Sequence, residues 1–273
     1  MSMAAGQRYD LGEDSEVNLH LNDQVAFVAG SSRGIGRAIA SALIDEGACV
    51  VLTGRDERAL EQTMADLVTE ENSNRILAIA GDLNSEATIL SAVSRTLDRF
   101  GRIDHLIANV GSGSGTLGPH PPSADWVRLF DQNFFTSVHL AEAALPALRR
   151  NGGSILFISS IVALEATSAP LPYSAAKAAL TNYAKNLSRL LAPERIRVNT
   201  IAPGNILFPG GSWERHLKNR KEAVEQMLRT DVPLQRFGTP AEVASLAAYL
   251  CSSLAAFATG ATYVMDGGQT RVI

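Results

Sequence analysis

The chain has 273 residues, of which 46% are hydrophobic and 19% are charged, and its formal net charge is −4. This length allows one large core, so we expect a single globular domain over residues 19–273. The negative charge argues against nucleic acid or an anionic membrane as the main partner and favours a small molecule or a neutral protein surface. No apolar run reaches the length of a membrane span, and the polar, acidic N-terminus does not resemble a secretory signal, which predicts a cytoplasmic protein.

Residues 1–18 are polar and without apolar period, so we expect a poorly ordered extension there. After it, short apolar runs alternate with longer helical patterns. Strands are expected at 24–30, 49–54, 75–82, 103–110, 154–160, 196–204 and 261–268, and helices near 34–46, 57–70, 86–99, 124–149, 173–192, 213–228 and 240–252. Most strand candidates are apolar throughout, as in strands buried on both faces of a parallel sheet. The alternation predicts an α/β fold with a doubly wound parallel sheet of about seven strands, helices on both faces (Rossmann-type), and ligands at the carboxyl ends of the strands.

The first expected strand runs directly into the glycine-rich segment AGSSRGIG, which opens the first helix. Glycines at such a junction let the backbone turn sharply and approach a pyrophosphate at the positive end of the helix. The spacing therefore predicts a dinucleotide site, whereas a tight turn without a ligand is the alternative. The cofactor contacts expected from this segment are Gly30, Ser32, Arg33, Gly34, Ile35 and Gly36.

The end of the second expected strand indicates which nicotinamide cofactor is preferred. A carboxylate there usually binds the ribose 2′-hydroxyl of NAD, whereas an arginine accommodates the 2′-phosphate of NADP. This chain has Arg55 at that place and Arg33 in the glycine-rich segment, and two guanidinium groups suit a phosphate. We therefore predict NADP(H), the alternative being two solvated surface arginines. Asp82, followed by Leu83, is expected at the adenine edge.

A tyrosine and a lysine four positions apart, Tyr173 and Lys177, share one face of an expected helix. A nearby cation favours the phenolate, so the pair is interpreted as a tuned proton donor. Ser159 and Ser160 end a strand upstream, where a hydroxyl can bind a carbonyl oxygen beside the tyrosine. The alternative is an aromatic side chain and a cation that share a helical face without reacting.

Taken together, the ordered motifs AGSSRGIG, GDL, ANVG, DQNF, YSAAK, IAPG and VMDGG resemble the short-chain dehydrogenase/reductase family over residues 19 to 271. The resemblance implies that Tyr173 is the general acid and base and that Ser160 polarises the substrate carbonyl. It also implies that Lys177 holds the nicotinamide ribose and lowers the pKa of Tyr173. Asn133, in DQNF, would hold a water molecule in the proton relay.

The same resemblance implies further cofactor-facing residues and two departures. The cofactor-facing residues would be Asn109, Gly111, Pro203, Gly204 and Ile206. Ala29 stands where the family usually has threonine, and ANVG replaces the more common NNAG, so the hydrogen bonds near the fourth strand must differ. Phe208 stands where a threonine often binds the nicotinamide amide, which leaves that contact and the path of the lid open.

Three segments are expected to line the substrate site: 111–123, 161–172 and a lid near 205–227. The first is rich in glycine and serine, and we expect it to be mobile. The other two supply apolar side chains, which suit an acyl chain or a ring better than a free sugar. A 3-oxoacyl thioester is the leading substrate prediction. The alternatives are a ring ketone, a steroid-like or polyketide carbonyl, or a non-catalytic cofactor-binding protein of the same fold.

Two further predictions concern partners. A basic cluster on the lid could meet an acyl carrier protein, although such a run is more often a solvated helix face; its members are Arg215, His216, Lys218, Arg220 and Lys221. The helix at 173–192 has more apolar faces than one core contact needs, which predicts burial by another subunit, and the family resemblance implies a homotetramer. The two cysteines lie in apolar runs and the five histidines are scattered, so we expect no metal site.

Overall fold

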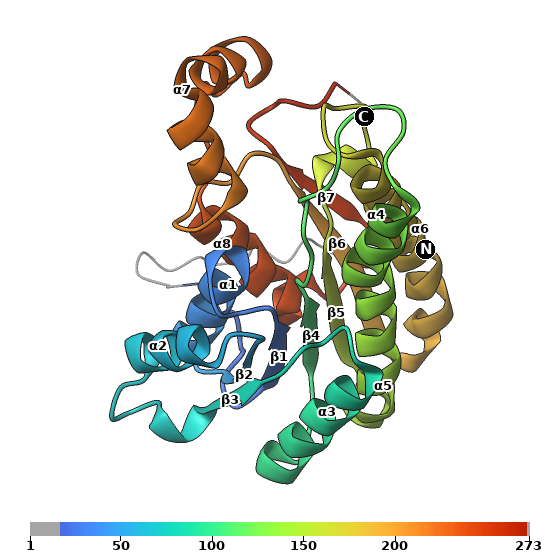
Figure 1. Ribbon diagram of the computed structural model, residues 1–273. Helices are drawn as coiled ribbons and strands as arrows, with labels where there is room; N and C mark the ends of the chain where they lie inside the picture. Colours follow the sequence, from blue (N-terminus) through green and yellow to red (C-terminus); the bar gives the residue numbers. More distant parts are fainter. Residues whose placement is uncertain (1–16, 272–273) are drawn as a thin grey trace, which may run out of the picture.

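The structure is a computed structural model that describes residues 17–271, so nearly all of the predicted N-terminal extension lies outside the described residues. The seven expected strands are all present and form one parallel sheet in the order β3-β2-β1-β4-β5-β6-β7 (Figure 1). Their bounds are β1 (Val25–Ala29), β2 (Cys49–Gly54), β3 (Ile76–Ala80), β4 (His105–Ala108), β5 (Gly153–Ile158), β6 (Ile196–Pro203) and β7 (Thr262–Met265). The predicted α/β fold is therefore confirmed.

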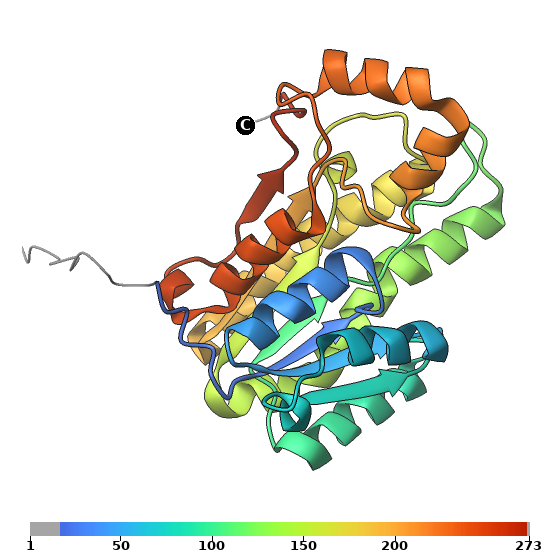
Figure 2. The same ribbon diagram turned by 90° about the vertical axis from the view of Figure 1, so that its left-hand side faces the viewer.

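Helices cover both faces of this sheet (Figures 1 and 2). One face is covered by α1 (Gly34–Asp45), α2 (Glu57–Leu67) and α8 (Pro240–Cys251), and the other by α3 (Glu86–Phe100), α5 (Thr136–Asn151) and α6 (Leu171–Leu191). The central strands are buried on both sides, which explains why β1 reads VAFVA without a polar alternation. The strand order reverses between β1 and β4, and in open α/β sheets the ligand crevice lies at that reversal, beyond the carboxyl ends of the strands.

One expected helix differs from the prediction. The segment predicted as a single helix over 124–149 consists of α4 (Ser123–Phe130), a π-helical turn (Asp131–Phe135) and α5. The turn contains Asn133, which is fully buried. A π-helical turn adds one residue to the helix and rotates the next helical turns about the axis, and such turns are frequent at functional sites. Hydrophobic periodicity does not detect one extra residue, so the sequence pattern read as continuous.

The segment predicted as a lid leaves β6 and continues into α7 (Ser212–Asp231), at the top of Figures 1 and 2. Its base is fixed to the body, because the Leu207 amide donates to the Gly238 carbonyl (3.0 Å) and the Gly238 amide donates to the Asn205 carbonyl (2.9 Å). Helix α7 is kinked at Arg220, where φ is −149° and ψ is 50°. Among the helices of residues 17–271, none has the length and apolar character needed to cross a membrane.

Candidate active site

The glycine-rich turn between β1 and α1 is built around positions that admit no side chain. Gly30 and Gly34 have φ of +69° and +58°, a region that disfavours other residues. A Cβ atom on Gly36 would overlap the Gly30 carbonyl oxygen. The backbone of this turn is therefore bare, and a ligand can approach it closely.

The N-terminus of α1 differs from those of three other helices. Helices α2, α3 and α8 begin with a capping side chain, respectively Asp56, Ser85 and Thr239, which accepts a hydrogen bond from the first turn. Helix α1 follows Arg33 with no capping side chain and no acidic residue in its first turn. Its free amide groups and positive helix end fit the pyrophosphate of a dinucleotide. The Ser32 carbonyl, in the turn itself, accepts a hydrogen bond from the Thr63 hydroxyl at 2.8 Å.

Two buried hydroxyl residues that sequence reasoning missed hold this turn in place. The Thr53 hydroxyl accepts from the Gly30 amide (3.0 Å), and the Ser31 hydroxyl donates to the Val28 carbonyl (2.9 Å) and accepts from the Thr53 amide (2.8 Å). Ser31 and Thr53 are essentially fully buried. They tie the end of β1 to the end of β2. The only sequence signal was a pair of polar residues at the ends of apolar runs.

The adenosine end of the predicted site carries exposed, positively charged side chains. Gly54 ends β2, and a Cβ atom there would lie 2.9 Å from Ser32 Cβ, so this position resists the longer carboxylate side chain typical of NAD binding. Arg55 and Arg33 are both exposed beside it. Arg33 Nη1 donates to the Gly210 carbonyl of the lid at 3.4 Å. Arg55 thus follows β2, and Arg33 lies in the neighbouring glycine-rich turn with its guanidinium on the lid carbonyl.

The segments after β3 and β4 complete the predicted cofactor crevice. Asp82 is exposed, and its carboxylate accepts from the amide of Asn84 at 3.1 Å, whereas Leu83 is buried. Asn109 Nδ2 donates to the Gly30 carbonyl at 2.9 Å, which ties the end of β4 to the glycine-rich turn.

Gly111 lies where two predicted catalytic residues meet. A Cβ atom on Gly111 would lie 2.5 Å from Asn133 Oδ1 and 3.2 Å from Lys177 Nζ. The amide of Asn133 is largely engaged: Nδ2 donates to the carbonyls of Ser112 (3.0 Å) and Leu129 (2.9 Å), and Oδ1 accepts from the Ser112 amide (3.1 Å). Both N–H groups are used, so only one lone pair of Oδ1 is left for the predicted relay water.

Lys177 and Tyr173 come from the first turns of α6, and their environment differs from the expectation in one respect. Lys177 is buried, its Nζ donates to the Ile158 carbonyl (2.8 Å), and burial lowers its pKa to about 8. Burial raises the pKa of Tyr173, and the interaction with the Ser160 side chain only partly offsets this. The expected lowering of the tyrosine pKa by Lys177 is therefore wrong for this structure. The i,i+4 spacing fixes a shared helical face but not the direction of the ammonium, which points to the Ile158 carbonyl.

The two serines at the end of β5 have different roles. The buried Ser159 hydroxyl lies 2.9 Å from the Thr181 hydroxyl and 3.3 Å from the Lys177 carbonyl that accepts from it, so it faces α6. Ser160 is only partly buried, its hydroxyl accepts from the Val162 amide (3.4 Å), and it interacts with Tyr173. Ser160 is thus the serine on the site side, as the family resemblance implies.

The lid closes over the glycine-rich turn through an aromatic ring. A Cβ atom on Gly34 would lie 2.6 to 2.9 Å from three ring atoms of Phe208, so the ring rests on the bare Gly34 backbone. Pro203 ends β6, and the next residue, Gly204, donates from its amide to the Met265 carbonyl at 2.9 Å. Phe208 thus faces the cofactor crevice in the place where the family often has threonine.

Ile206 fits a nicotinamide contact through its backbone. The bridge between the lid base and Gly238 uses the carbonyl of Asn205 and the amide of Leu207. The Ile206 amide and carbonyl take no part in this bridge, so they could pair with the oxygen and nitrogen of a carboxamide. Its side chain is buried and packs toward Gly238, away from the glycine-rich turn.

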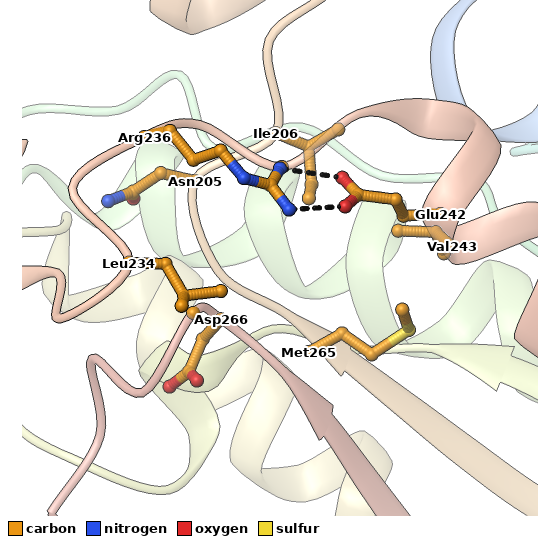
Figure 3. A pocket seen from close by; sticks show the side chains of 10 residues that line it. Asn205, Ile206, Leu234, Arg236, Glu242, Val243, Met265 and Asp266 are labelled. Carbon is orange, nitrogen blue, oxygen red and sulfur yellow. Dashed lines mark hydrogen bonds and ion pairs between the residues drawn. The ribbon is translucent and has the colours of Figure 1, made fainter.

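A cavity of about 150 Å³ lies beneath the base of the lid (Figure 3). It is lined by Asn205, Ile206, Leu234, Arg236, Gly238, Glu242, Val243, Met265, Asp266 and Gly267. Arg236 spans it in a two-bond ion pair with Glu242 at 2.6 and 3.1 Å. None of the four predicted catalytic residues lines this cavity, so it belongs to the hinge of the lid rather than to the reacting centre.

The basic cluster on α7 is largely paired within the helix. Lys218 lies 3.3 Å from Glu214, Lys221 lies 3.8 Å from Glu225, and Arg220 hydrogen-bonds His216 at 3.1 Å. The two lysine–glutamate pairs are exposed i,i+4 contacts, which stabilise a helix only weakly. Of the cluster, Arg215 alone makes only a long contact, 3.5 Å to the Gly210 carbonyl, among the described residues. In residues 17–271, histidine, cysteine and acidic side chains form no group able to hold a metal ion.

Comparison with known proteins agrees with this architecture. Residues 29–270 match the family model described as Enoyl-(Acyl carrier protein) reductase. The chain is 38% identical over 251 residues to the L-fucose dehydrogenase of Mus musculus. This alignment covers 90% of this chain and 88% of that protein. It is 30% identical over 259 residues to the 7alpha-hydroxysteroid dehydrogenase of Escherichia coli K12, covering 93% and 97%.

The solved structures give the same result. L-sorbose reductase from Gluconobacter frateurii, in complex with NADPH and L-sorbose, superposes with a TM-score of 0.87 at 30% identity, over 94% of this chain and 100% of that one. The glycine-rich turn, the seven-stranded order and the Ser160, Tyr173, Lys177 constellation are thus found in a chain whose relatives are dehydrogenases and reductases. The chain belongs to the short-chain dehydrogenase/reductase family, the NAD(P)-dependent oxidoreductases that interconvert alcohols and ketones.

Proposed function

We propose that this protein interconverts a ketone and a secondary alcohol with NADP(H), using Tyr173 as the proton donor and acceptor. The observation that carries the proposal is the meeting of Tyr173, Ser160 and Lys177 at the carboxyl edge of the sheet, next to the uncapped N-terminus of α1. This arrangement supports catalysis rather than cofactor binding alone, because a binding protein needs no proton donor beside the crevice.

The roles of the side chains follow from their chemistry. A bound nicotinamide supplies or accepts the hydride. The Ser160 hydroxyl donates a hydrogen bond to the carbonyl oxygen and orients it, and Tyr173 Oη delivers a proton to that oxygen. The buried Lys177 ammonium, which also donates to the Ile158 carbonyl, binds the ribose hydroxyls. Asn133 shapes the end of the relay through which a new proton reaches the tyrosine.

We propose NADPH as the preferred cofactor. Arg33 and Arg55 support it, since both are exposed at the end of β2, where Gly54 provides no carboxylate for a ribose diol. The NADPH complex of the related sorbose reductase is consistent with this choice.

For the substrate, we propose a ring alcohol or ring ketone. The names of two relatives support this class, since one is an L-fucose dehydrogenase and another a 7alpha-hydroxysteroid dehydrogenase. The leading prediction from the sequence, a 3-oxoacyl thioester on an acyl carrier protein, has less support, because Lys218 and Lys221 are paired with glutamates on their own helix. The thioester is kept as the competing substrate in the experiment.

The experiment measures NADPH and NADH oxidation by the purified protein against a keto steroid, a keto sugar and an acetoacetyl thioester, with the reverse reaction on L-fucose. We expect turnover with a ring substrate and a kcat/KM at least tenfold higher for NADPH than for NADH. Turnover with the thioester alone would reverse the substrate proposal. Equal use of NADH would contradict the cofactor proposal.

We also propose a homotetramer. Exposed apolar side chains on α4, the π-helical turn and α6 support it, among them Val127, Phe135 and Leu190, because a monomer would leave them in water. Sedimentation analysis tests this assignment. The single catalytic domain over residues 19–273 and the cytoplasmic location remain predictions.

A further inference from the structure

The glycine- and serine-rich segment after β4, residues 111–116 (GSGSGT), is not a free loop, and we call it the strap. Its backbone is bonded at every second residue to the segment formed by α4 and the π-helical turn. The Asn133 side chain accepts a hydrogen bond from the Ser112 amide and donates one to the Ser112 carbonyl. Arg128 Nη2 donates to the Ser114 carbonyl at 2.9 Å, and Asp125 Oδ2 accepts from the Thr116 amide at 2.7 Å. These hydrogen bonds speak against the expected mobility of the segment.

The glycines of the strap pack against different neighbours. A Cβ atom on Gly111 would lie 2.5 Å from Asn133 Oδ1 and 3.2 Å from Lys177 Nζ. One on Gly113 would lie 3.6 Å from the Tyr173 ring, and one on Gly115 would lie 2.8 Å from Leu129 and 3.2 Å from Pro170. The bare backbone at Gly113 is therefore the part of the strap that lies against Tyr173.

Asp125 and Arg128 form one closed unit with the strap. Arg128 Nη2 also donates to Asp125 Oδ1 at 2.6 Å, while the second carboxylate oxygen of Asp125 accepts from the Thr116 amide. The Asp125 side chain is mostly shielded, at 16% exposure, whereas Arg128 is 41% exposed. The hydrogen bonds from Arg128 and Thr116 lower the pKa of Asp125 to about 2, so the unit stays charged across the working pH range.

We propose that Asp125 and Arg128 are positioning residues for the reaction, which act by clamping the strap against the Tyr173 ring. This inference rests on the proposed role of Tyr173. An acceptor is required at position 125 because the strap offers an amide there, and a donor is required at 128 because the strap offers a carbonyl. A simple helix-stabilising ion pair has no such requirement: its order changes helix stability only slightly, and it makes no contact with the strap.

This difference defines the test. Asp125→Leu removes the acceptor at similar size, Asp125→Asn keeps it, and the charge-swapped double variant Asp125→Arg with Arg128→Asp restores an ion pair but reverses donor and acceptor. We expect Asp125→Leu and the swap to lower kcat at least tenfold, with the Kd for NADPH within threefold of wild type, and Asp125→Asn to stay within threefold in kcat. A swap that restores kcat would overturn the proposal, as would wild-type kcat in Asp125→Leu.

A second readout does not depend on activity. Hydrogen exchange of the peptide covering 111–118 should accelerate at least tenfold in Asp125→Leu and in the swap, and should be unchanged in Asp125→Asn. Glu194→Gln is the matched control, because Glu194 forms a similar exposed two-bond pair with Arg149 away from the strap. It should alter neither kcat nor the exchange of this peptide. Unchanged exchange in Asp125→Leu would also overturn the proposal.

The outcomes separate this inference from the proposed function. Full turnover in Tyr173→Phe would remove the proposed role of the tyrosine, whatever the exchange data show. Loss of turnover in Tyr173→Phe together with normal kcat in Asp125→Leu would refute the clamp alone.

Discussion

The buried ammonium of Lys177 makes stability depend on pH in an unusual direction. Burial lowers the pKa of Lys177 from 10.5 to about 8 in the folded protein. The unfolded chain therefore holds this proton between about pH 8 and 10.5 while the folded protein does not, so the free energy of unfolding rises with pH through this window. At 1.36 kcal/mol per pKa unit, the gain between pH 7 and pH 10 is about 2–3 kcal/mol.

The assay is urea unfolding of the cofactor-free protein at pH 7, 8, 9 and 10, compared with Lys177→Met. The variant lacks the titrating group, so the wild type should gain about 2–3 kcal/mol relative to it over this range. Loss of the hydrogen bond to Ile158 costs the variant the same at every pH and cancels in the difference. Lys185→Met is the matched control, because Lys185 lies on the same helix and also donates to a backbone carbonyl, that of Gly260 at 2.9 Å, but is exposed.

We expect the pH dependence of Lys185→Met to run parallel to that of the wild type. Parallel curves for the wild type and Lys177→Met would refute the reasoning, since the ammonium would then titrate alike in the folded and unfolded states.

Three further predictions concern the cofactor crevice. Replacing Arg33 and Arg55 together with glutamine should weaken NADPH binding by about 2–4 kcal/mol and leave NADH within a small factor, by fluorescence titration, since charged hydrogen bonds contribute about 1.5–3 kcal/mol each; equal losses would make the arginines structural. Phe208→Ala should speed NADPH dissociation at least fivefold in stopped-flow measurements, because the ring closes the lid onto the glycine-rich turn; an unchanged rate would separate the ring from cofactor exchange. Gly36→Ala should abolish cofactor binding, because its Cβ would overlap the Gly30 carbonyl; tight NADPH binding by a folded variant would contradict the assigned turn.

The sequence predicted those features that depend on local geometry, such as buried strands and glycine-rich turns. Continuous apolar runs such as VAFVA predicted buried parallel strands, and the positions of Gly30, Gly34 and Gly36 predicted a bare turn at a helix start. Tyr173 and Lys177 could be paired from their spacing alone. These features depend on local geometry, which periodicity and backbone preference largely determine.

The missed features depend on contacts that local patterns do not encode. The strap read as mobile because GSGSGT has the composition of a flexible linker, and its anchors Asp125 and Arg128 lie about ten residues further on. The pKa of Tyr173 depends on burial and on where the Lys177 ammonium points, and neither can be read from i,i+4 spacing. The π-helical turn at Asn133 adds a single residue, too little to break an apolar period.

The most direct test of the central claim is single-turnover hydride transfer from bound NADPH in the wild type and in Tyr173→Phe, with the NADPH Kd measured on the same samples. The account predicts that the phenylalanine variant binds NADPH within threefold of the wild type and transfers hydride to the ketone at least a hundredfold more slowly at neutral pH, because only the proton donor is lost. Transfer at a rate near that of the wild type, with binding intact, would contradict the claim that Tyr173 protonates the substrate.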